Sequence, residues 1–211
     1  MPLLDDLDEA IQTGNCERTD VLTRTALEES LDPKKILDCM VGAMDVVGQR
    51  FQCGQAYVPE MLFASRAMKT GVGLLEPILV AEGFTPDLKA IIGTVQGDLH
   101  DLGKNLVIMM WRGANIEVVD LGTDVAPARF LEAVAEHQPQ LIGLSSLLTT
   151  TMPAMKATIQ VLKTARLEGI KTIVGGAPIS AQFARDIGAD GYAQDAVSAV
   201  SVARGLVTQS N

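Results

Sequence analysis

The chain has 211 residues and a formal net charge of −9 at pH 7, and it is 47% hydrophobic but only 4% aromatic. A charge this negative argues against nucleic acid as a partner, because phosphate binding needs clustered Lys and Arg. The apolar content excludes a disordered chain, and the length suffices for one large domain or two small ones.

The first 86 residues predict helices. Apolar residues recur at helical spacing, and the expected helices run over about 3–11 and 17–31, from 33 past 47, and from 59 toward 80. Asp32 followed by Pro33 is typical of an N-cap and the first helical position. Pro77 is expected to kink or split the last helix. We therefore predict a four-helix-bundle cap domain over residues 1–86.

From Lys89 onward, short apolar runs rich in β-branched residues alternate with helical segments. Strands are expected over 90–95, 116–120, 141–145, 172–174 and 191–193, with helices near 103–113, 126–137, 152–168, 180–187 and 196–208. Continuous apolar runs are typical of strands that are buried on both faces. The fold class is therefore α/β: after the helical cap in the sequence, residues 87–211 are expected to form a flavodoxin-like (Rossmann-like) domain. Its five-stranded parallel sheet has the order 2-1-3-4-5, and the domain boundary falls in 83–88.

The expected strand order places a ligand site between the loops that follow the first and third strands. His100 lies in the first of these loops, between Asp98 and Asp101. A neutral imidazole binds a metal through one nitrogen, and its other N–H needs an acceptor, which Asp98 can supply. His137 stands at a predicted helix end, an ordinary place for a cation. On these residues alone, a purely structural His100 remains an open alternative.

The cysteines and the apolar segments argue against a disulfide framework, a zinc site and a membrane span. Cys16, Cys39 and Cys53 stand at unrelated spacings without a Cys-x-x-Cys pair, which argues against a disulfide framework and a zinc site. No apolar run reaches the length of a membrane span, and no basic start precedes an apolar run. We therefore expect a cytoplasmic protein that does not bind membranes.

Three short motifs follow one another in the second part of the chain. They are Asp98-x-His100-x-x-Gly103, Ser145-x-Leu147 after 41 further residues, and Gly175-Gly176 after another 27. In order and spacing they resemble the base-off, histidine-on cobalamin-binding signature of methionine synthase and of the corrinoid proteins of methyltransferase systems. The resemblance extends over essentially the whole chain.

The resemblance implies a role for each matching residue. His100 would ligate the cobalt of cobalamin from below, Asp98 would accept the other ring N–H, and Thr151 would complete this chain where methionine synthase has serine. Phe51 and Val58 of the cap would cover the upper face of the corrin. Ser145 and Thr149 would bond the displaced nucleotide tail, and Gly175 and Gly176 would line its slot. The other implied cofactor contacts are Leu99, Asp101, Leu102, Gly103 and Leu147.

The resemblance also implies a function, that of a corrinoid methyl carrier. Its cofactor would be cobalamin, as methylcobalamin or cob(I)alamin, and it would shuttle a methyl group from a substrate-specific methyltransferase to an acceptor methyltransferase that uses tetrahydrofolate or coenzyme M. A reductive activator protein would be a further partner, and a homodimer is possible. The chain would then be a non-catalytic carrier subunit. Methanol, methylamines, betaines and aromatic methyl ethers are all candidate donors. General likeness favours O-demethylation of aromatic methyl ethers, although no residue supports that choice.

Two alternatives remain open at this stage. A cobalamin-dependent sensor or regulator would use the cap to relay its state to a partner, although the acidic cap lacks a basic DNA-reading helix. A flavodoxin-like signalling domain without a corrinoid would stay colourless after incubation with cobalamin, whereas a methyl carrier would turn red.

Overall fold

The computed structural model describes residues 2–82, 86 and 88–208, which form two compact units. The helical unit extends to Pro86 and includes Gly113–Asn115. The α/β unit holds the other described residues, from Leu88 to Arg112 and from Ile116 to Thr208. The boundary stretch that the sequence places over 83–88 lies mostly outside the described residues.

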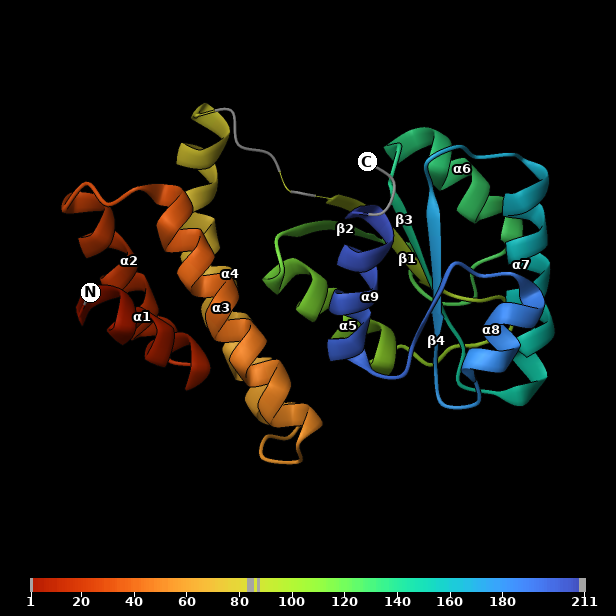
Figure 1. Ribbon diagram of the computed structural model, residues 1–211, viewed down its shortest axis with the longest axis horizontal. Coiled ribbons are helices and arrows are strands. Elements are labelled where there is room, and N and C mark those ends of the chain that lie inside the picture. Colours follow the sequence, from red (N-terminus) through yellow and green to blue (C-terminus); the bar gives the residue numbers. More distant parts are fainter. Residues whose placement is uncertain (1, 83–85, 87, 209–211) are drawn as a thin grey trace. The chain divides into compact units, whose positions relative to one another are not determined.

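Four helices make up the described helical unit (Figure 1): α1 (Pro2–Gln12), α2 (Cys16–Glu28), α3 (Pro33–Gln52) and α4 (Val58–Ala81). Side-chain caps fix two of the helix starts, because Asn15 accepts the Arg18 N–H at 3.0 Å and Asp32 accepts the Lys34 N–H at 2.9 Å. Aliphatic and Met side chains fill the interior, among them Leu7, Ile11, Ile36, Met40, Met44, Met61 and Leu75. The predicted set of four helices is confirmed.

Helix α4 continues through Pro77 without splitting, contrary to one of the two expectations. Pro77 lies in the last turn and a half of the helix, so its missing N–H removes only one intrahelical hydrogen bond near the end. The helix has 24 residues. Even so, none of the helices in the described part of the chain combines the length and apolar character needed to cross a bilayer.

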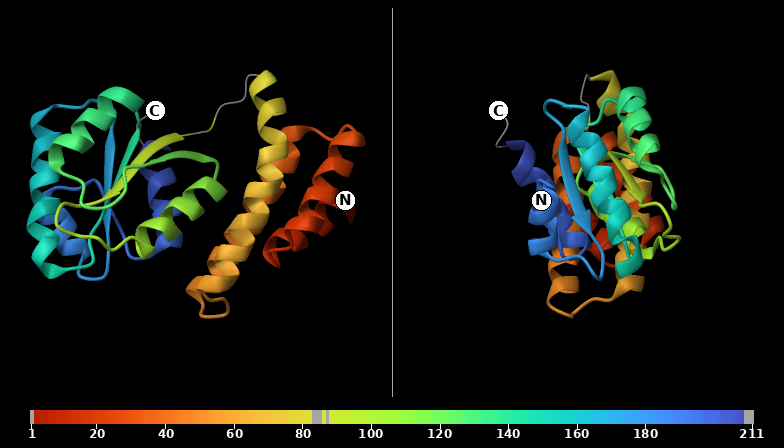
Figure 2. Two further views of the ribbon diagram at one scale, coloured as in Figure 1. Left: turned by 180° about the vertical axis from the view of Figure 1, so that it is seen from behind. Right: turned by 90° about the vertical axis from the view of Figure 1, so that its right-hand side faces the viewer.

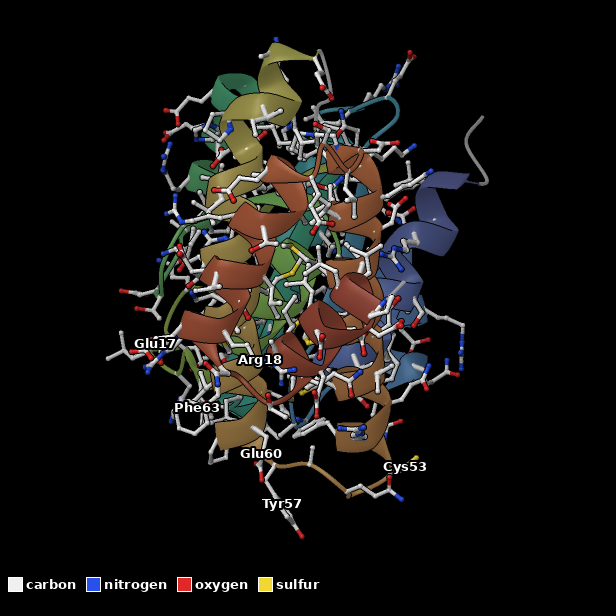
Figure 3. The ribbon with its side chains drawn as sticks, turned by 90° about the vertical axis from the view of Figure 1, so that its left-hand side faces the viewer. Glu17, Arg18, Cys53, Tyr57, Glu60 and Phe63 are labelled. Atoms are coloured by element: carbon white, nitrogen blue, oxygen red, sulfur yellow. The ribbon has the colours of Figure 1, made fainter. Side chains whose placement is uncertain are left out.

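Two large apolar side chains of the helical unit are exposed near the turn between α3 and α4. Tyr57 is 66% exposed and Phe63 is 51% exposed, and Figure 3 places both with Cys53 and Glu60 at one end of the bundle. Glu60 accepts the Tyr57 N–H at 3.1 Å, which fixes the start of α4. The backbone of Phe63 packs closely on the α1–α2 turn, because a Cβ at Gly14 would come within 2.8 Å of the Phe63 carbonyl carbon.

Five parallel strands form the sheet of the α/β unit: β1 (Leu88–Thr94), β2 (Ile116–Asp120), β3 (Leu141–Ser145), β4 (Lys171–Gly175) and β5 (Gly191–Ala193). Their order is β2-β1-β3-β4-β5, as the sequence predicts. All five predicted strands are present, and β1 begins before the expected residue 90. The sheet therefore has its switch point between β1 and β3.

Helices cover both faces of this sheet (Figures 1 and 2): α5 (Leu102–Gly113) and α9 (Ala196–Thr208) lie on one face, and α6 (Pro127–His137), α7 (Met152–Thr164) and α8 (Ala181–Ile187) on the other. Buried Trp111 joins α5 to α9 through a 3.1 Å hydrogen bond from its ring N–H to the Ala199 carbonyl. Helix α7 ends before the expected residue 168, because the chain turns through left-handed Arg166 and Gly169, with φ of 50° and 76°.

Candidate functional site

The carboxyl ends of β1 and β3 bring together the two loops that the sequence singles out. Thr94 and Ser145 are paired at the ends of these strands, and the Val95 N–H donates to the Ser145 carbonyl at 3.0 Å. The loop after β1 carries Asp98 and His100, and the loop after β3 ends in a short 3-10 turn, Thr149–Thr151. The expected placement of the site at this edge agrees with the sheet topology.

Asp98 is the centre of the hydrogen bonding between these loops. Its side chain is fully buried. One carboxylate oxygen, Oδ1, accepts the backbone N–H of His100 at 3.0 Å and bonds the Nδ1 of the same residue at 2.8 Å. The other, Oδ2, accepts the N–H of Leu147 at 2.7 Å, the N–H of Leu148 at 3.3 Å and the Thr151 hydroxyl at 3.0 Å. A single carboxylate therefore ties both loops together.

The charge state of Asp98 follows from two opposing effects on its pKa. Burial alone would raise the pKa of this carboxyl, because it penalises the charged form. Hydrogen bonds from the His100 and Leu147 N–H groups, the His100 ring and the Thr151 hydroxyl outweigh burial and hold the pKa well below its usual range. Asp98 is therefore a carboxylate at neutral pH and can act only as an acceptor.

His100 is held at three points by its neighbours. Besides the two bonds to Asp98, its carbonyl accepts the Thr94 hydroxyl at 2.9 Å. Because a carboxylate faces Nδ1, the ring carries its proton there when neutral, and Nε2 keeps a lone pair. The side chain is 52% exposed, and no hydrogen bond from the described residues reaches Nε2. The imidazole can therefore give one metal ligand, and a bound group must supply the others.

Four exposed leucines belong to the segments that flank His100. Leu99 is 74% and Leu102 65% exposed after β1, and Leu147 is 42% and Leu148 40% exposed after β3. Single exposed apolar residues are ordinary on a protein surface, but several on two adjacent segments indicate a surface that a ligand or a partner covers. We call these four residues the leucine rim.

Gly103 stands in the first turn of α5, and a Cβ there would meet nothing within 4 Å. Glycine weakens a helix relative to alanine, and packing within the protein gives no reason for it here. Space beside this backbone is thus available to a bound group. The neighbouring Asp101 is exposed and accepts the Asn105 side chain at 3.0 Å, a bond within the start of α5.

The glycine pair at the end of β4 has a reason within the protein itself. A Cβ at Gly176 would lie 1.8 Å from the Ser146 carbonyl oxygen, and one at Gly175 would lie 2.9 Å from the Ala193 carbonyl oxygen. Gly176 also has φ of 130°, a conformation that other residues rarely adopt. Both glycines therefore allow close approach of neighbouring backbones. The expectation that they line a ligand slot stays a prediction.

The other predicted residues lie in two places. Ser145 is half-buried at the end of β3, and Thr149 is exposed in the following turn. Phe51 and Val58 belong to the helical unit, where both are half-buried on either side of the turn between α3 and α4. Their contact with a ligand held by the α/β unit stays a prediction.

Sequence reasoning missed three buried polar residues at this edge, namely Ser146, Lys104 and Thr94, whose hydroxyl bonds the His100 carbonyl. Ser146 is fully buried, with its hydroxyl oxygen 2.8 Å from that of Thr151. Lys104 is 2% exposed, and its Nζ lies 2.7 Å from both carboxylate oxygens of Asp120 at the end of β2. A sequence signal for Lys104 existed, because a lysine in a mostly apolar helix, one turn after His100, indicates a buried charge that needs a partner. For Ser146 no sequence signal distinguished it from its neighbour.

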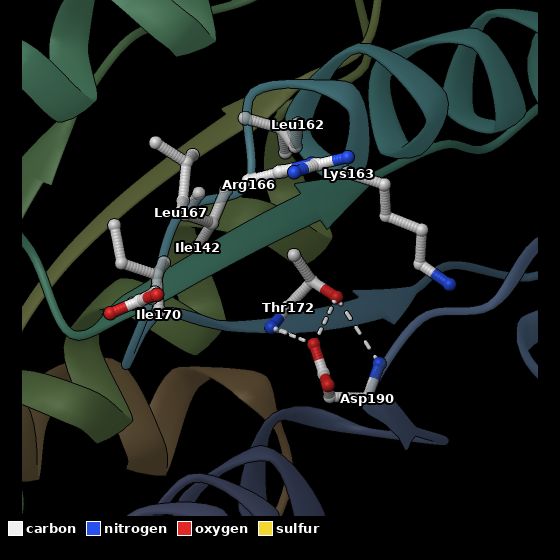
Figure 4. Close-up of a pocket in the computed structure, with 9 residues that line it drawn as sticks. Ile142, Leu162, Lys163, Arg166, Leu167, Ile170, Thr172 and Asp190 are labelled. Atoms are coloured by element: carbon white, nitrogen blue, oxygen red, sulfur yellow. Dashed lines mark hydrogen bonds between the residues drawn. The ribbon is translucent and has the colours of Figure 1, made fainter.

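A cavity of about 350 Å³ lies at the opposite edge of the sheet, where β4 and β5 begin (Figure 4). Its wall includes Leu162, Ile170 and Arg166. Asp190 closes one side by accepting the N–H and the hydroxyl of Thr172, at 2.8 and 2.7 Å. The cavity lies at the amino ends of the strands and its lining includes no residue of the two loops around His100. It is therefore separate from the carboxyl edge, where parallel sheets bind ligands.

Replacing Asp98 by Asn should destabilise the protein more than removing the histidine it holds. Asn places an N–H₂ group against N–H donors and loses the charge, so we expect a loss of about 3 kcal/mol in the free energy of unfolding. His100→Ala removes an exposed side chain and should cost less than about 1 kcal/mol. Urea unfolding of the protein without ligand measures both, and equal losses would contradict the central role of Asp98.

Gly176→Ala should destabilise the protein, because the new Cβ would clash with Ser146 and alanine rarely adopts the backbone conformation of this position. We expect a loss of about 3 kcal/mol or more in the free energy of unfolding. Gly169→Ala is the matched control, since it also has positive φ but nothing within 4 Å of a new Cβ. It should cost about 1 kcal/mol. Thermal or urea unfolding that gives the two variants the same stability would argue against the close approach.

Two B12 binding domain families match the chain, one over residues 3–76 and one over residues 88–201. A corrinoid protein of Desulfitobacterium hafniense is 37% identical over 98% of both chains. Dimethylamine corrinoid protein 2 of Methanosarcina acetivorans is 38% identical over 97% of this chain and 96% of its own length.

Two solved structures share the fold over nearly the whole chain. A cobalamin-binding protein from Desulfitobacterium hafniense has a TM-score of 0.81 at 27% identity, covering 97% of this chain and 98% of its own. A chain of the methanol:cobalamin methyltransferase complex from Methanosarcina barkeri has a TM-score of 0.87 at 26% identity, covering 98% of this chain and 80% of its own. The predicted resemblance and cobalamin as the cofactor are confirmed. The chain belongs to the family of cobalamin-binding corrinoid proteins of methyltransferase systems.

Proposed function

We propose that this protein carries methyl groups between separate methyltransferases on a cobalamin held by His100. The observation that carries the proposal is the half-exposed imidazole whose Nδ1 bonds a buried carboxylate and whose Nε2 is left for a metal. Relatives named for dimethylamine and methanol systems support a carrier over a sensor. The chain would then be a carrier subunit that needs a partner for each chemical step.

The residues present fit cobalamin. The corrin supplies ligands to cobalt around its ring, so the protein needs to add only one, and His100 offers one exposed nitrogen. The leucine rim suits the apolar part of a flat macrocycle, and the open space at Gly103 suits close approach to the backbone. When bound, cobalamin supplies a cobalt centre that accepts and releases a methyl group.

The chain's own residues would orient the ligand nitrogen and keep water from it. Asp98 holds the proton on Nδ1 and so fixes the tautomer that presents Nε2, and Thr151 steadies Asp98 from behind. The leucine rim would exclude water from the surroundings of the His100 ligand nitrogen. Ser145 and Thr149 are candidates for bonds to the displaced nucleotide tail.

The helical unit would serve as a movable cover. We propose that residues 1–86 and 87–211 act as separate domains, with Phe51 and Val58 of the first closing over the reactive side of the cofactor. Both side chains are half-buried in the helical unit, and exposed Tyr57 precedes Val58. Such a cover must open for each partner enzyme, since access to the methyl group requires it.

The partners would be a substrate-specific methyltransferase, an acceptor methyltransferase that uses tetrahydrofolate or coenzyme M, and a reductive activator. For the donor we favour a methylated amine, because relatives with 38% and 41% identity are named dimethylamine and trimethylamine corrinoid proteins. Aromatic methyl ethers stay a predicted donor class that no residue supports.

His100→Ala should retain part of its cobalamin through the rest of the site but lose normal methyl transfer. We expect the transfer rate to fall at least about 10-fold, because the ligand that steadies the metal is gone. Transfer from methylcobalamin-loaded protein to an acceptor methyltransferase measures this. His137→Ala changes the other histidine, on α6, and should behave like the parent. Equal rates for His100→Ala and the parent would refute the proposed role.

A donor panel separates the substrate classes. The reduced holoprotein is offered dimethylamine, trimethylamine, methanol and an aromatic methyl ether, each with a methyltransferase specific for that donor. Methylation of the cofactor, followed by its absorption spectrum, should be fastest with an amine. Faster methylation with the ether or with methanol would overturn the amine assignment while leaving the carrier function intact.

A further inference from the structure

We propose that Ser146 is a positioning residue for His100, because its hydroxyl donates to Thr151 and thereby directs the Thr151 hydroxyl onto Asp98. The chain of side chains behind the imidazole would then have four members, which we call the His100 relay: His100, Asp98, Thr151 and Ser146. The inference rests on the proposed function in one respect, namely that His100 is the ligand of the cofactor.

Burial and distance place Ser146 in contact with the rest of the relay. Its side chain is fully buried, and Thr151 is 5% exposed. The two hydroxyl oxygens are 2.8 Å apart, and the Thr151 oxygen lies 3.0 Å from Asp98 Oδ2. Since water has no access to a fully buried hydroxyl, its hydrogen bonds must come from the protein.

Counting protons fixes the direction of these bonds. Ser146 and Thr151 have one hydroxyl proton each, and the acceptors within reach are Asp98 Oδ2, the Leu148 carbonyl and the oxygen of the other hydroxyl. The Leu148 carbonyl already accepts the Thr151 backbone N–H at 3.1 Å. The Thr151 proton goes to Asp98, because a bond to a carboxylate is stronger than one to a neutral carbonyl or hydroxyl oxygen.

The Ser146 proton must then point at Thr151. Two hydroxyl oxygens 2.8 Å apart would repel each other without a proton between them, and the alternative acceptor, the Leu148 carbonyl, is farther away at 3.3 Å. Each donor in such a series polarises the next bond. Without the Ser146 hydroxyl this polarisation is lost, so the Thr151 bond to Asp98 weakens and the competing Leu148 carbonyl, at 2.9 Å, takes a larger share of the Thr151 proton.

The glycine pair holds Ser146 in its place. The Ser146 N–H donates to the Gly175 carbonyl at 3.2 Å, and Gly176 packs so closely that a Cβ would lie 1.8 Å from the Ser146 carbonyl oxygen. The third sequence motif therefore supports the backbone of Ser146. The glycine pair therefore acts on His100 indirectly, through Ser146 and the other members of the His100 relay.

The test compares Ser146→Ala, Thr151→Val and the double variant after loading with methylcobalamin. The visible spectrum gives the ratio of histidine-coordinated to uncoordinated cofactor. Ser146→Ala should lower this ratio by about 3- to 10-fold, the worth of one hydrogen bond. Ser146→Cys, which keeps a weaker donor, should fall between Ser146→Ala and the parent. In the Thr151→Val background, Ser146→Ala should change nothing further, because its effect passes through the Thr151 hydroxyl.

A second readout uses the cofactor-free protein. The nitrogen NMR shifts of the His100 ring report its tautomer, and Ser146→Ala should reduce the population with the proton on Nδ1. Thr158→Val is the matched control, because it removes another fully buried hydroxyl, one that donates only within α7, to Ala154 at 2.9 Å. It should leave the ratio and the tautomer as in the parent.

The outcomes separate the two claims. If Ser146→Ala matches the parent in both readouts, or lowers the ratio equally with and without the Thr151 hydroxyl, Ser146 is not a positioning residue, and the proposed function stands. If the loaded His100→Ala protein has the spectrum of the parent, the proposed function fails, and the nitrogen shifts of the cofactor-free protein still decide whether Ser146 acts on the ring.

Discussion

The buried carboxylate of Asp98 is the interaction on which the rest of the site depends. It accepts hydrogen bonds from both loops at the carboxyl edge of the sheet, and these bonds outweigh the penalty of burying its charge. The same carboxylate fixes the proton on the His100 ring. One group thus sets the conformation of two loops and presents a free imidazole nitrogen, so that binding a metal requires little rearrangement of the protein.

The parallel sheet supplies the framework for this carboxylate. Because β1 and β3 are neighbours although they are not consecutive in the chain, their carboxyl ends bring together residues 98 and 151. The contacts behind Asp98 continue to β4, because the glycine pair at the end of β4 packs on Ser146. Each of the three sequence motifs therefore lies at the end of a different strand: the first contains the imidazole, and the other two support it through Asp98 and Ser146.

Most of the fold and the centre of the site could be predicted from the sequence. Periodicity located the helices and strands, and the resemblance of the motifs to the cobalamin-binding signature implied roles for His100, Asp98 and Thr151. Ser146 was missed because strand patterning cannot tell which of two adjacent serines turns inward once the strand ends. Of the two expected effects of Pro77, a kink or a split, the split does not occur, because the cost of a proline depends on its position within the helix. The close approach behind Gly176 depends on three-dimensional packing that no local pattern contains.

The central claim is that His100 would hold the cobalt in place of the cofactor's own base. The most direct measurement is electron paramagnetic resonance of the protein loaded with cob(II)alamin, with and without nitrogen-15 in its histidines. The account predicts that labelling changes the nitrogen splitting from a triplet to a doublet, and that His100→Ala abolishes this change. A splitting that is unaffected by histidine labelling would mean that the benzimidazole stays bound, and would contradict the account.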